Sequence, residues 1–255
     1  MKLGVCCSAG EAAWAKESGC EYVELNFTSV TDMDEEAFEE AKAALADAGM
    51  KSEAMNCFIP RRFPLMTLED LGELEAYMYK GFGRARRMGT ELVVFGSAGA
   101  RVRPGGVTKE EGIQKLAPIF ALAGRVAKEH GMRIAIEPLS YTECNAVNTL
   151  REGMALAKAA NNEVELLADM YHVARNNEDF GDILLAADIL IHTHIARPEG
   201  RKYPMPGDGY DYAPFFAALK KAGYAARLSV EASAPNGPQD LAVTLAYLRE
   251  IIASV

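Results

Sequence analysis

Short β-rich runs alternate with helix-like segments from one end of the 255-residue chain to the other. The segments between the runs repeat their apolar residues with a helical period, as residues 34–49 and 109–131 do. Strict strand–helix alternation favours a parallel sheet whose faces are covered by helices. The eight runs that we interpret as strands are 3–8, 22–27, 52–59, 91–97, 133–139, 164–171, 189–196 and 227–233.

The number of these units and the chain length together predict one closed barrel. Eight strand–helix units match a single (β/α)8 barrel, which holds about 250 residues. A doubly wound open sheet is the alternative, but no glycine-rich GxGxxG loop follows the first strand. We expect an α/β fold, a single (β/α)8 TIM barrel domain over residues 1–255. Five glycines suit left-handed turns at the predicted helix ends: Gly19, Gly49, Gly89, Gly131 and Gly223.

The composition limits the partners and the compartment. With 36 acidic and 27 basic residues the net charge is −9, which argues against binding a nucleic-acid backbone. The N-terminal residues do not have the pattern of a signal peptide, and no run of ~18 apolar residues predicts a membrane span. Five cysteines without CxxC spacing indicate reduced core residues and a cytoplasmic protein. They are Cys6, Cys7, Cys20, Cys57 and Cys144.

Polar groups stand at the ends of the last four predicted strands. Glu137, Asp169, His194 and Glu231 are separated by 32, 25 and 37 residues, close to one strand–helix repeat. The carboxyl ends of barrel strands converge, so these four side chains can point at one another. Three carboxylates and one imidazole around a divalent cation satisfy the charge, and this donor set suits Mn²⁺, Mg²⁺ or Co²⁺. We expect one such ion, with Mn²⁺ as the first choice.

Each of these residues also has a structural interpretation. Asp169 could be a helix cap, and Glu137 could be a loop carboxylate before Pro138. His192 could be packed in the core or be a partner of the site, and Glu24 could face the site or be structural. The regular spacing of the four polar groups favours a shared site over four separate structural roles.

Two long irregular segments, 96–107 and 196–212, follow the fourth and seventh predicted strands. Loops at the carboxyl ends of barrel strands carry the chemistry of such folds. Each contains two arginines, which we expect either in a solvated loop or at the site: Arg101, Arg103, Arg197 and Arg201.

Four motifs carry a resemblance to a known family. Residues 136–143 (IEPLSYTE), 169–172 (DMYH), 194–196 (HIA) and 229–233 (SVEAS) resemble motifs of the xylose isomerase-like barrels. They look most like the sugar phosphate isomerase/epimerase branch and, within it, the ketose 3-epimerases that act on D-tagatose and D-psicose. Similarity of element order runs over the whole chain, although the motifs cover few residues.

The resemblance implies roles for individual residues. It implies one divalent metal held by Glu137, Asp169, His194 and Glu231. It also implies that Glu143, His172 and an arginine orient the sugar. That arginine usually lies six residues beyond the metal histidine, where this chain has Gly200, so Arg201 is the nearest match and Arg197 the second. The family often forms homodimers, and we expect one here.

The expected chemistry is proton transfer through a metal-stabilised enediolate of a ketose or related keto-sugar. Glu137 and Glu231 lie across the barrel mouth, so one removes a proton and the other returns one to the opposite face. A lyase or dehydratase acting on a keto-sugar or keto-inositol would use the same metal and base. A hydrolase resembling the apurinic-site endonucleases ranks low, because strands three and four supply no histidines. A non-catalytic metal-binding barrel is the remaining alternative.

Overall fold

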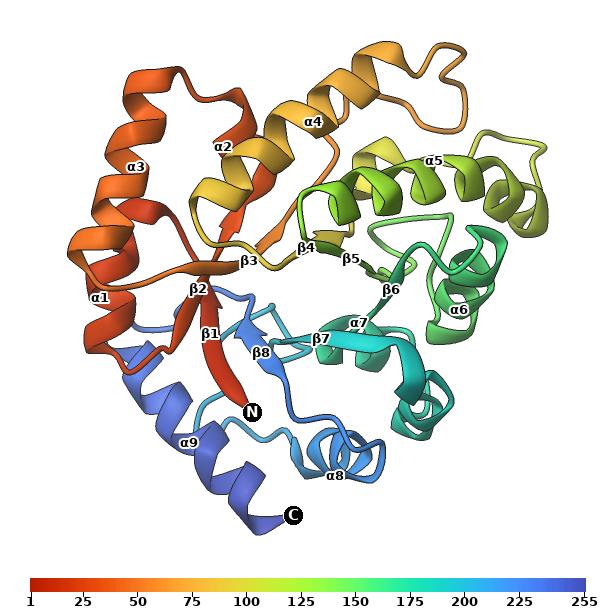
Figure 1. Cartoon of the computed structure of the whole chain (residues 1–255). Helices are drawn as coiled ribbons and strands as arrows, with labels where there is room; N and C mark the ends of the chain where they lie inside the picture. Colours follow the sequence, from red (N-terminus) through yellow and green to blue (C-terminus); the bar gives the residue numbers. More distant parts are fainter.

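A computed structural model describes residues 1–255 and confirms the predicted barrel. Eight parallel strands close in the order β1 to β8, with β8 paired back onto β1, and helices surround them (Figure 1). The strands are β1 (Lys2–Cys6), β2 (Tyr22–Asn26), β3 (Ser52–Asn56), β4 (Leu92–Phe95), β5 (Arg133–Ile136), β6 (Glu165–Asp169), β7 (Leu190–Ile195) and β8 (Arg227–Val230).

Helices connect successive strands around the outside of the barrel. The α-helices are α1 (Ala12–Glu17), α2 (Phe27–Asp32), α3 (Glu35–Asp47), α4 (Gly72–Arg87), α5 (Lys109–Glu129), α6 (Leu150–Ala159), α7 (Met170–Arg175), α8 (Ala213–Lys221) and α9 (Asp240–Ser254). Short 3₁₀ helices are η1 (Ala9–Glu11), η2 (Ala98–Ala100) and η3 (Phe180–Ile189). None of the helices combines the length and apolarity needed to cross a membrane.

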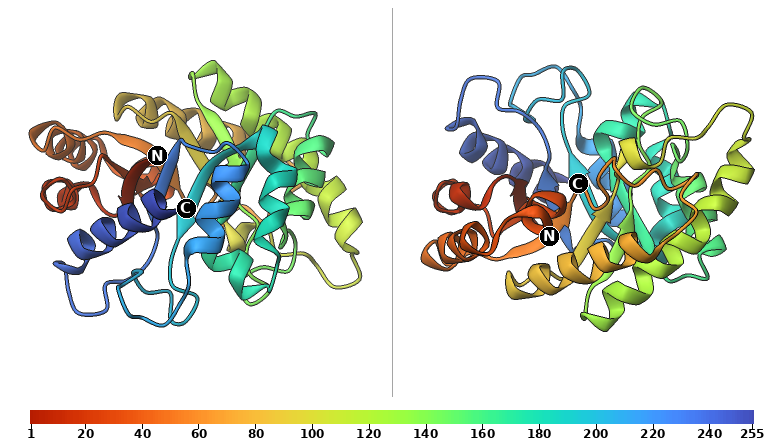
Figure 2. Two further views of the ribbon diagram at one scale, coloured as in Figure 1. Left: turned by 90° about the horizontal axis from the view of Figure 1, so that it is seen from below. Right: turned by 90° about the horizontal axis from the view of Figure 1, so that it is seen from above.

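The predicted strand runs are correct in number and position but too long at their carboxyl ends. The five glycines predicted at helix ends all have positive φ, from 61° at Gly49 to 98° at Gly19. Those turns return the chain to the barrel, whereas the residues beyond each strand leave the ladder and form loops. The loops after β7 and β8 project from one end of the barrel (Figure 2).

Packing inside the barrel links β1, β2 and β8. Gly4 on β1 leaves room for the ring of Tyr22, since a Cβ at Gly4 would lie 2.6 Å from Tyr22 Cζ. The Tyr22 hydroxyl lies 2.7 Å from the Ser229 hydroxyl on β8. The barrel interior is therefore filled by side chains at this level.

The amino ends of the strands carry paired charges. Glu53 accepts hydrogen bonds from Lys2 Nζ at 2.8 Å and from Arg227 Nε at 2.6 Å, and Arg227 also pairs with Glu91. These residues come from β1, β3, β8 and the segment before β4. The pairing matches the stabilising role of this face in (β/α)8 barrels.

The cysteine prediction is correct in one respect and wrong in another. All five cysteines are free thiols, and Cys20 and Cys144 are buried. Cys57, however, is exposed, and Cys6 and Cys7 are only partly buried. Cys57 lies in the segment after β3 with φ of 53°, so the predicted continuation of that strand through residue 59 does not form.

Glu178 gives the fold a predicted dependence on pH. Its Oε2 accepts the Leu150 N–H at 2.9 Å, while its Oε1 is buried without a partner. Burial, with the charges of Asp182 and Glu152, raises the pKa of this carboxyl from 4.5 to about 7. A raised carboxyl pKa stabilises the fold below the unfolded value, and that contribution is lost as the pH rises through about 7.

We predict that Glu178→Gln, which stays neutral, raises the Tm relative to the natural protein more at high pH than at low pH. Glu178 is partly exposed, so solvent screening limits the gain to about 1 kcal/mol, roughly 2–4 °C in Tm. Thermal unfolding followed by circular dichroism, at a pH below 5 and a pH above 8, measures the difference. An equal shift at both pH values would contradict the prediction.

Candidate metal centre

Four side chains from successive strand ends meet at the carboxyl end of the barrel. Glu137 directly follows β5, Asp169 ends β6, His194 lies in β7 and Glu231 directly follows β8. One donor atom from each lies within 4.8 Å of all the others. His194 Nδ1 is 3.1 Å from Glu137 Oε1 and 3.4 Å from Glu231 Oε2. The structure thus brings together the four residues that the spacing singled out.

Asp169 serves the fold and the cluster at once. Its Oδ1 accepts the Tyr171 N–H at 2.8 Å and so caps the short helix α7. Its Oδ2 lies 3.4 Å from His172 Nε2 and faces the cluster. The capping interpretation of the sequence is therefore confirmed, and the second oxygen still faces the cluster, so the site role stays a prediction.

The electrostatics of the cluster show a shortage of positive charge. Burial, reinforced by Glu137, raises the pKa of Asp169 to about 7. Burial also raises the pKa of Glu137, helped by the charge of Glu231. Glu231 differs, because the charge and hydrogen bond of His194, together with Arg201, outweigh burial and lower its pKa to about 2.

This donor set fits a divalent cation. Two buried carboxylates, the partly buried carboxylate of Glu231 and one imidazole nitrogen converge, and burial and mutual repulsion favour protonation of the two buried ones. A divalent ion would remove that penalty by supplying charge between them. Oxygen donors with a single imidazole are typical of Mn²⁺ or Mg²⁺ sites and differ from the cysteine-rich sets of structural zinc.

His172 presents a neutral ring to the cluster. Its Nδ1 accepts the Ser140 N–H at 3.0 Å, so its proton is on Nε2. Burial, with the positive charge of Arg201 nearby, lowers the pKa of His172 to about 3. Its Nε2 is buried without a hydrogen-bond partner and lies 4.0 Å from Glu137 Oε1. The Nε2–H group of His172 therefore forms no hydrogen bond in the structure, although carboxylate oxygens of Asp169 and Glu137 lie nearby.

Arg201, and not Arg197, reaches the cluster. Arg201 Nη2 donates to Glu231 Oε2 at 2.5 Å, and Nη1 lies 3.3 Å from Glu143 Oε2. Its guanidinium also stacks over the Tyr171 ring at 4.7 Å. Arg197 instead faces Glu199 at 3.5 Å. The predicted residues Glu143, His172 and Arg201 therefore all lie at one side of the four-residue cluster.

A model of the xylose isomerase-like TIM barrel family matches residues 12–251. The chain belongs to the xylose isomerase-like TIM barrel family.

Among curated relatives, an L-ribulose 3-epimerase of Methylomonas sp. (strain DH-1) is 33% identical over 132 residues. That alignment covers 50% of this chain and 44% of the relative. A ketose 3-epimerase of Arthrobacter globiformis is 31% identical over 114 residues, or 43% of this chain and 39% of the relative. These alignments span less than half of either relative's length.

Solved structures extend the likeness in fold over the whole chain. A D-psicose 3-epimerase from Clostridium cellulolyticum H10, solved with D-tagatose, superposes with a TM-score of 0.84. The superposition covers 99% of both chains at 16% identity. This likeness establishes the shared barrel architecture of the family.

Sequence reasoning missed the neighbours of the site in this xylose isomerase-like barrel. A cavity of about 490 Å³ opens beside Glu231 and is lined by Cys6, Asn26, Asn56 and Cys57 among others. Asn56 Nδ2 donates to Glu231 Oε1 at 3.1 Å. These residues end or follow β1, β2 and β3, and nothing in their local patterns marks them.

For Arg101 the structure excludes the first of the two expectations, a solvated loop. Its side chain is fully buried, and Nη2 donates to the Glu137 carbonyl oxygen at 2.9 Å. Nε and Nη1 have no partner, and burial lowers the pKa of the guanidinium. The loop after β4 therefore folds inward and places a positive charge behind Glu137.

Gly96 yields a prediction about the shape of the centre. A Cβ at Gly96 would lie 2.1 Å from Glu137 Oε2, so Gly96→Ala must displace that carboxylate. Only the end of a flexible side chain has to move, so we expect the fold to persist. Binding of Mn²⁺ should weaken by about tenfold or more, measured by isothermal titration calorimetry.

The matched control for this variant is Gly105→Ala, in the same loop, where an added Cβ meets nothing within 4 Å. It should bind Mn²⁺ like the natural protein. Equal affinity of Gly96→Ala and Gly105→Ala would show that the placement of the Glu137 carboxylate does not matter for the ion.

Proposed function

We propose that the protein is a divalent-metal-dependent sugar isomerase or epimerase that acts on a ketose or a related keto-sugar. The observation that carries the proposal is the convergence of Glu137 and Glu231, which follow β5 and β8, with Asp169 and His194, next to a cavity that Glu231 lines. The similarity to curated L-ribulose and ketose 3-epimerases supports it.

In this proposal Glu137, Asp169, His194 and Glu231 hold the ion. A bound divalent cation polarises the carbonyl of the sugar and lowers the cost of removing the neighbouring proton. Glu137 and Glu231 then act as the acid/base pair, because they approach the substrate from opposite directions. Removal of a proton by one and return by the other to the opposite face inverts the carbon.

The neighbouring residues fit the recognition of a polyhydroxylated substrate. The unpartnered Nε2–H of His172 can donate to a sugar oxygen, and the guanidinium of Arg201 can do the same. Glu143, about one-third exposed beside Arg201, can accept from a hydroxyl. Asn26 and Asn56 add amide groups to the cavity wall. We assign substrate binding to Glu143, His172 and Arg201.

The acidic character of the site and chain favours a sugar over a nucleic acid. Three carboxylates form the cluster, and the net charge is −9, so a phosphate backbone would be repelled. The preference for Mn²⁺, the homodimer and the cytoplasmic location stay predictions.

We predict proton exchange on the substrate in D₂O. The protein is incubated with Mn²⁺ and a panel of free and phosphorylated ketoses, and the products are followed by NMR and mass spectrometry. Deuterium should enter at a carbon next to the carbonyl in a sugar whose configuration or carbonyl position has changed. Absence of exchange on every sugar would overturn the proposal, and loss of water without epimerisation would favour the lyase.

The control for this experiment is Glu231→Gln, which keeps the size of the side chain but cannot take up a proton. We expect turnover to be lost, by about 10²-fold or more, because general acid/base catalysis contributes that much. Retained activity in Glu231→Gln would contradict the acid/base assignment while leaving the fold and the metal centre intact.

Metal addition should stabilise the folded protein. A cation that binds only the native state adds about 2.7 kcal/mol at a free concentration of 100 Kd. The Tm of chelator-treated protein should therefore rise on addition of Mn²⁺, measured by differential scanning calorimetry. The variant Asp169→Asn keeps a side chain that can cap α7 but should lose this rise in Tm. In the control Asp182→Asn, a carboxylate that pairs with Arg151 outside the cluster is removed, and the rise should be retained. A rise of equal size in Asp169→Asn would place the ion elsewhere.

A further inference from the structure

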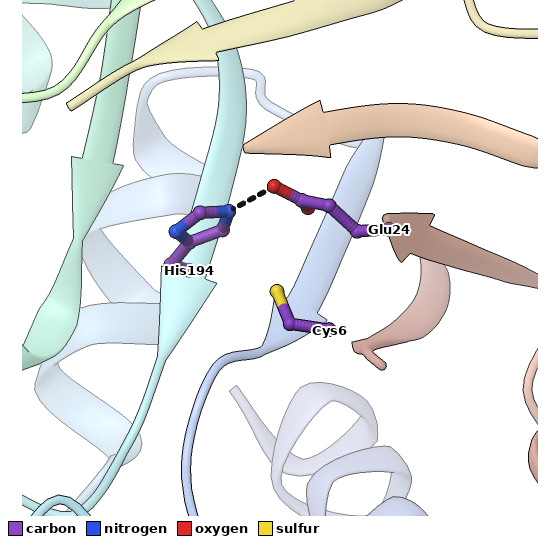
Figure 3. A group of neighbouring side chains, drawn as sticks. All are labelled: Cys6, Glu24 and His194. Atoms are coloured by element: carbon purple, nitrogen blue, oxygen red, sulfur yellow. Dashed lines mark hydrogen bonds and ion pairs between the residues drawn. The ribbon is translucent and has the colours of Figure 1, made fainter. Parts of the chain in front are cut away.

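A buried carboxylate lies next to the four-residue cluster without belonging to it. Glu24, on β2, is fully buried, and Figure 3 shows it pointing at His194 with Cys6 beside the pair. Glu24 Oε1 lies 2.9 Å from His194 Nε2. Its Oε2 lies 2.7 Å from His192 Nε2 and accepts the Ser229 hydroxyl at 2.6 Å. Both oxygens therefore have partners that can donate.

The charge state of Glu24 follows from these partners. Two imidazole nitrogens and the Ser229 hydroxyl lie within hydrogen-bond distance of its oxygens, and hydrogen bonds donated to a carboxylate favour its ionised form. An ionised carboxylate only accepts hydrogen bonds, so each imidazole must carry its proton on Nε2. The remaining nitrogen of His194, Nδ1, faces Glu137 and Glu231.

We propose that Glu24 is a positioning residue of the metal centre, which holds His194 with its proton on Nε2 and so presents Nδ1 to the cation. This inference rests on the proposed function, since it assigns a role toward the same ion. A histidine ligand is oriented and made more basic when its other nitrogen donates to a carboxylate. Here the carboxylate is itself fixed by His192 and Ser229, and the Tyr22 hydroxyl lies 2.7 Å from Ser229.

A separate cation site at the same residues is the competing interpretation. One donor atom each from Cys6, Glu24 and His194 lies within 4.8 Å of the others. An ion there would have to replace the proton between Glu24 and His194. It would also need the thiolate of Cys6, whose thiol pKa is raised by burial and by the charge of Glu24. The hydrogen-bonded arrangement needs neither change, so we favour the positioning role.

The first test determines by NMR which nitrogen of the His194 ring carries the proton. The ¹⁵N-labelled natural protein is loaded with Zn²⁺, which is diamagnetic, and long-range ¹H–¹⁵N correlation spectra identify the protonated nitrogen of each of the four histidines. We expect His194 to keep its Nε2 proton and to bind through Nδ1, with one Zn²⁺ per chain. Loss of the Nε2 proton, or a second Zn²⁺ that Cys6→Ser removes, would overturn the proposal.

The second test measures Mn²⁺ affinity by isothermal titration calorimetry. Glu24→Gln keeps the shape but loses the charge and one acceptor, so we expect the Kd to rise by about 10- to 100-fold. The control Ser229→Ala removes a hydrogen bond to Oε2 only and leaves Oε1 to His194, so its Kd should change by less than about threefold. Circular dichroism checks that both variants fold. If Glu24→Gln does not fold, the ¹H–¹⁵N spectra of the Zn²⁺-loaded natural protein alone test the role of Glu24.

The outcomes separate this inference from the proposed function. Mn²⁺ binding by the natural protein without exchange on any ketose overturns the function and leaves the role of Glu24 standing. Equal Mn²⁺ affinity of Glu24→Gln and the natural protein overturns the role of Glu24 and leaves the function standing. A natural protein that binds no divalent cation overturns both.

Discussion

The pairing of β8 with β1 is the interaction on which the site depends. Their register runs from Lys2 opposite Arg227 to Val5 opposite Val230, and it closes the sheet. Closure places Glu231, at the end of β8, across the barrel from Glu137, at the end of β5. In an open sheet with the same strand order, the residues at its edge could not face those at its centre. The four-residue cluster is thus a consequence of the backbone ladder, before any side chain interacts.

The two ends of the barrel differ in how far their charged side chains are paired with opposite charges. At the amino ends, Glu53 and Arg227 are paired with neighbours, so burial there carries little penalty. At the carboxyl ends, carboxylates outnumber the available cations, and burial together with the charge of Glu137 raises the pKa of Asp169 to about 7. A group of buried like charges persists only where the surrounding structure holds it in place. This contrast separates the stabilising face of the barrel from the face that we propose to be catalytic.

The sequence predicted the fold and the central cluster because both depend on spacing along the chain. One polar residue per strand–helix repeat is visible without knowing any contact, and Glu137, Asp169, His194 and Glu231 followed from it. The burial of Arg101 and the exposure of Cys57 did not follow, because each depends on how a loop packs. The sequence indicated that Glu24 could face the site, but it did not indicate what Glu24 would do there. The role that we propose for it depends on hydrogen bonds to β7 and β8, which lie about 170 to 200 residues away in sequence.

The loop after β7 shows how a shifted arginine can still reach the site. Gly200 and Arg201 both adopt positive φ, 77° and 48°, so the backbone turns sharply at these two residues. For a non-glycine residue this conformation costs about 1 kcal/mol, and it persists only where other contacts impose it. Here one backbone β-bridge joins Arg197 to Lys202, and a second joins Lys202 to Ser233 beyond β8. The loop is therefore anchored on both sides. The anchored turn directs Arg201 toward Glu231, so Arg201 contacts the cluster although Gly200 stands where the resemblance implied an arginine.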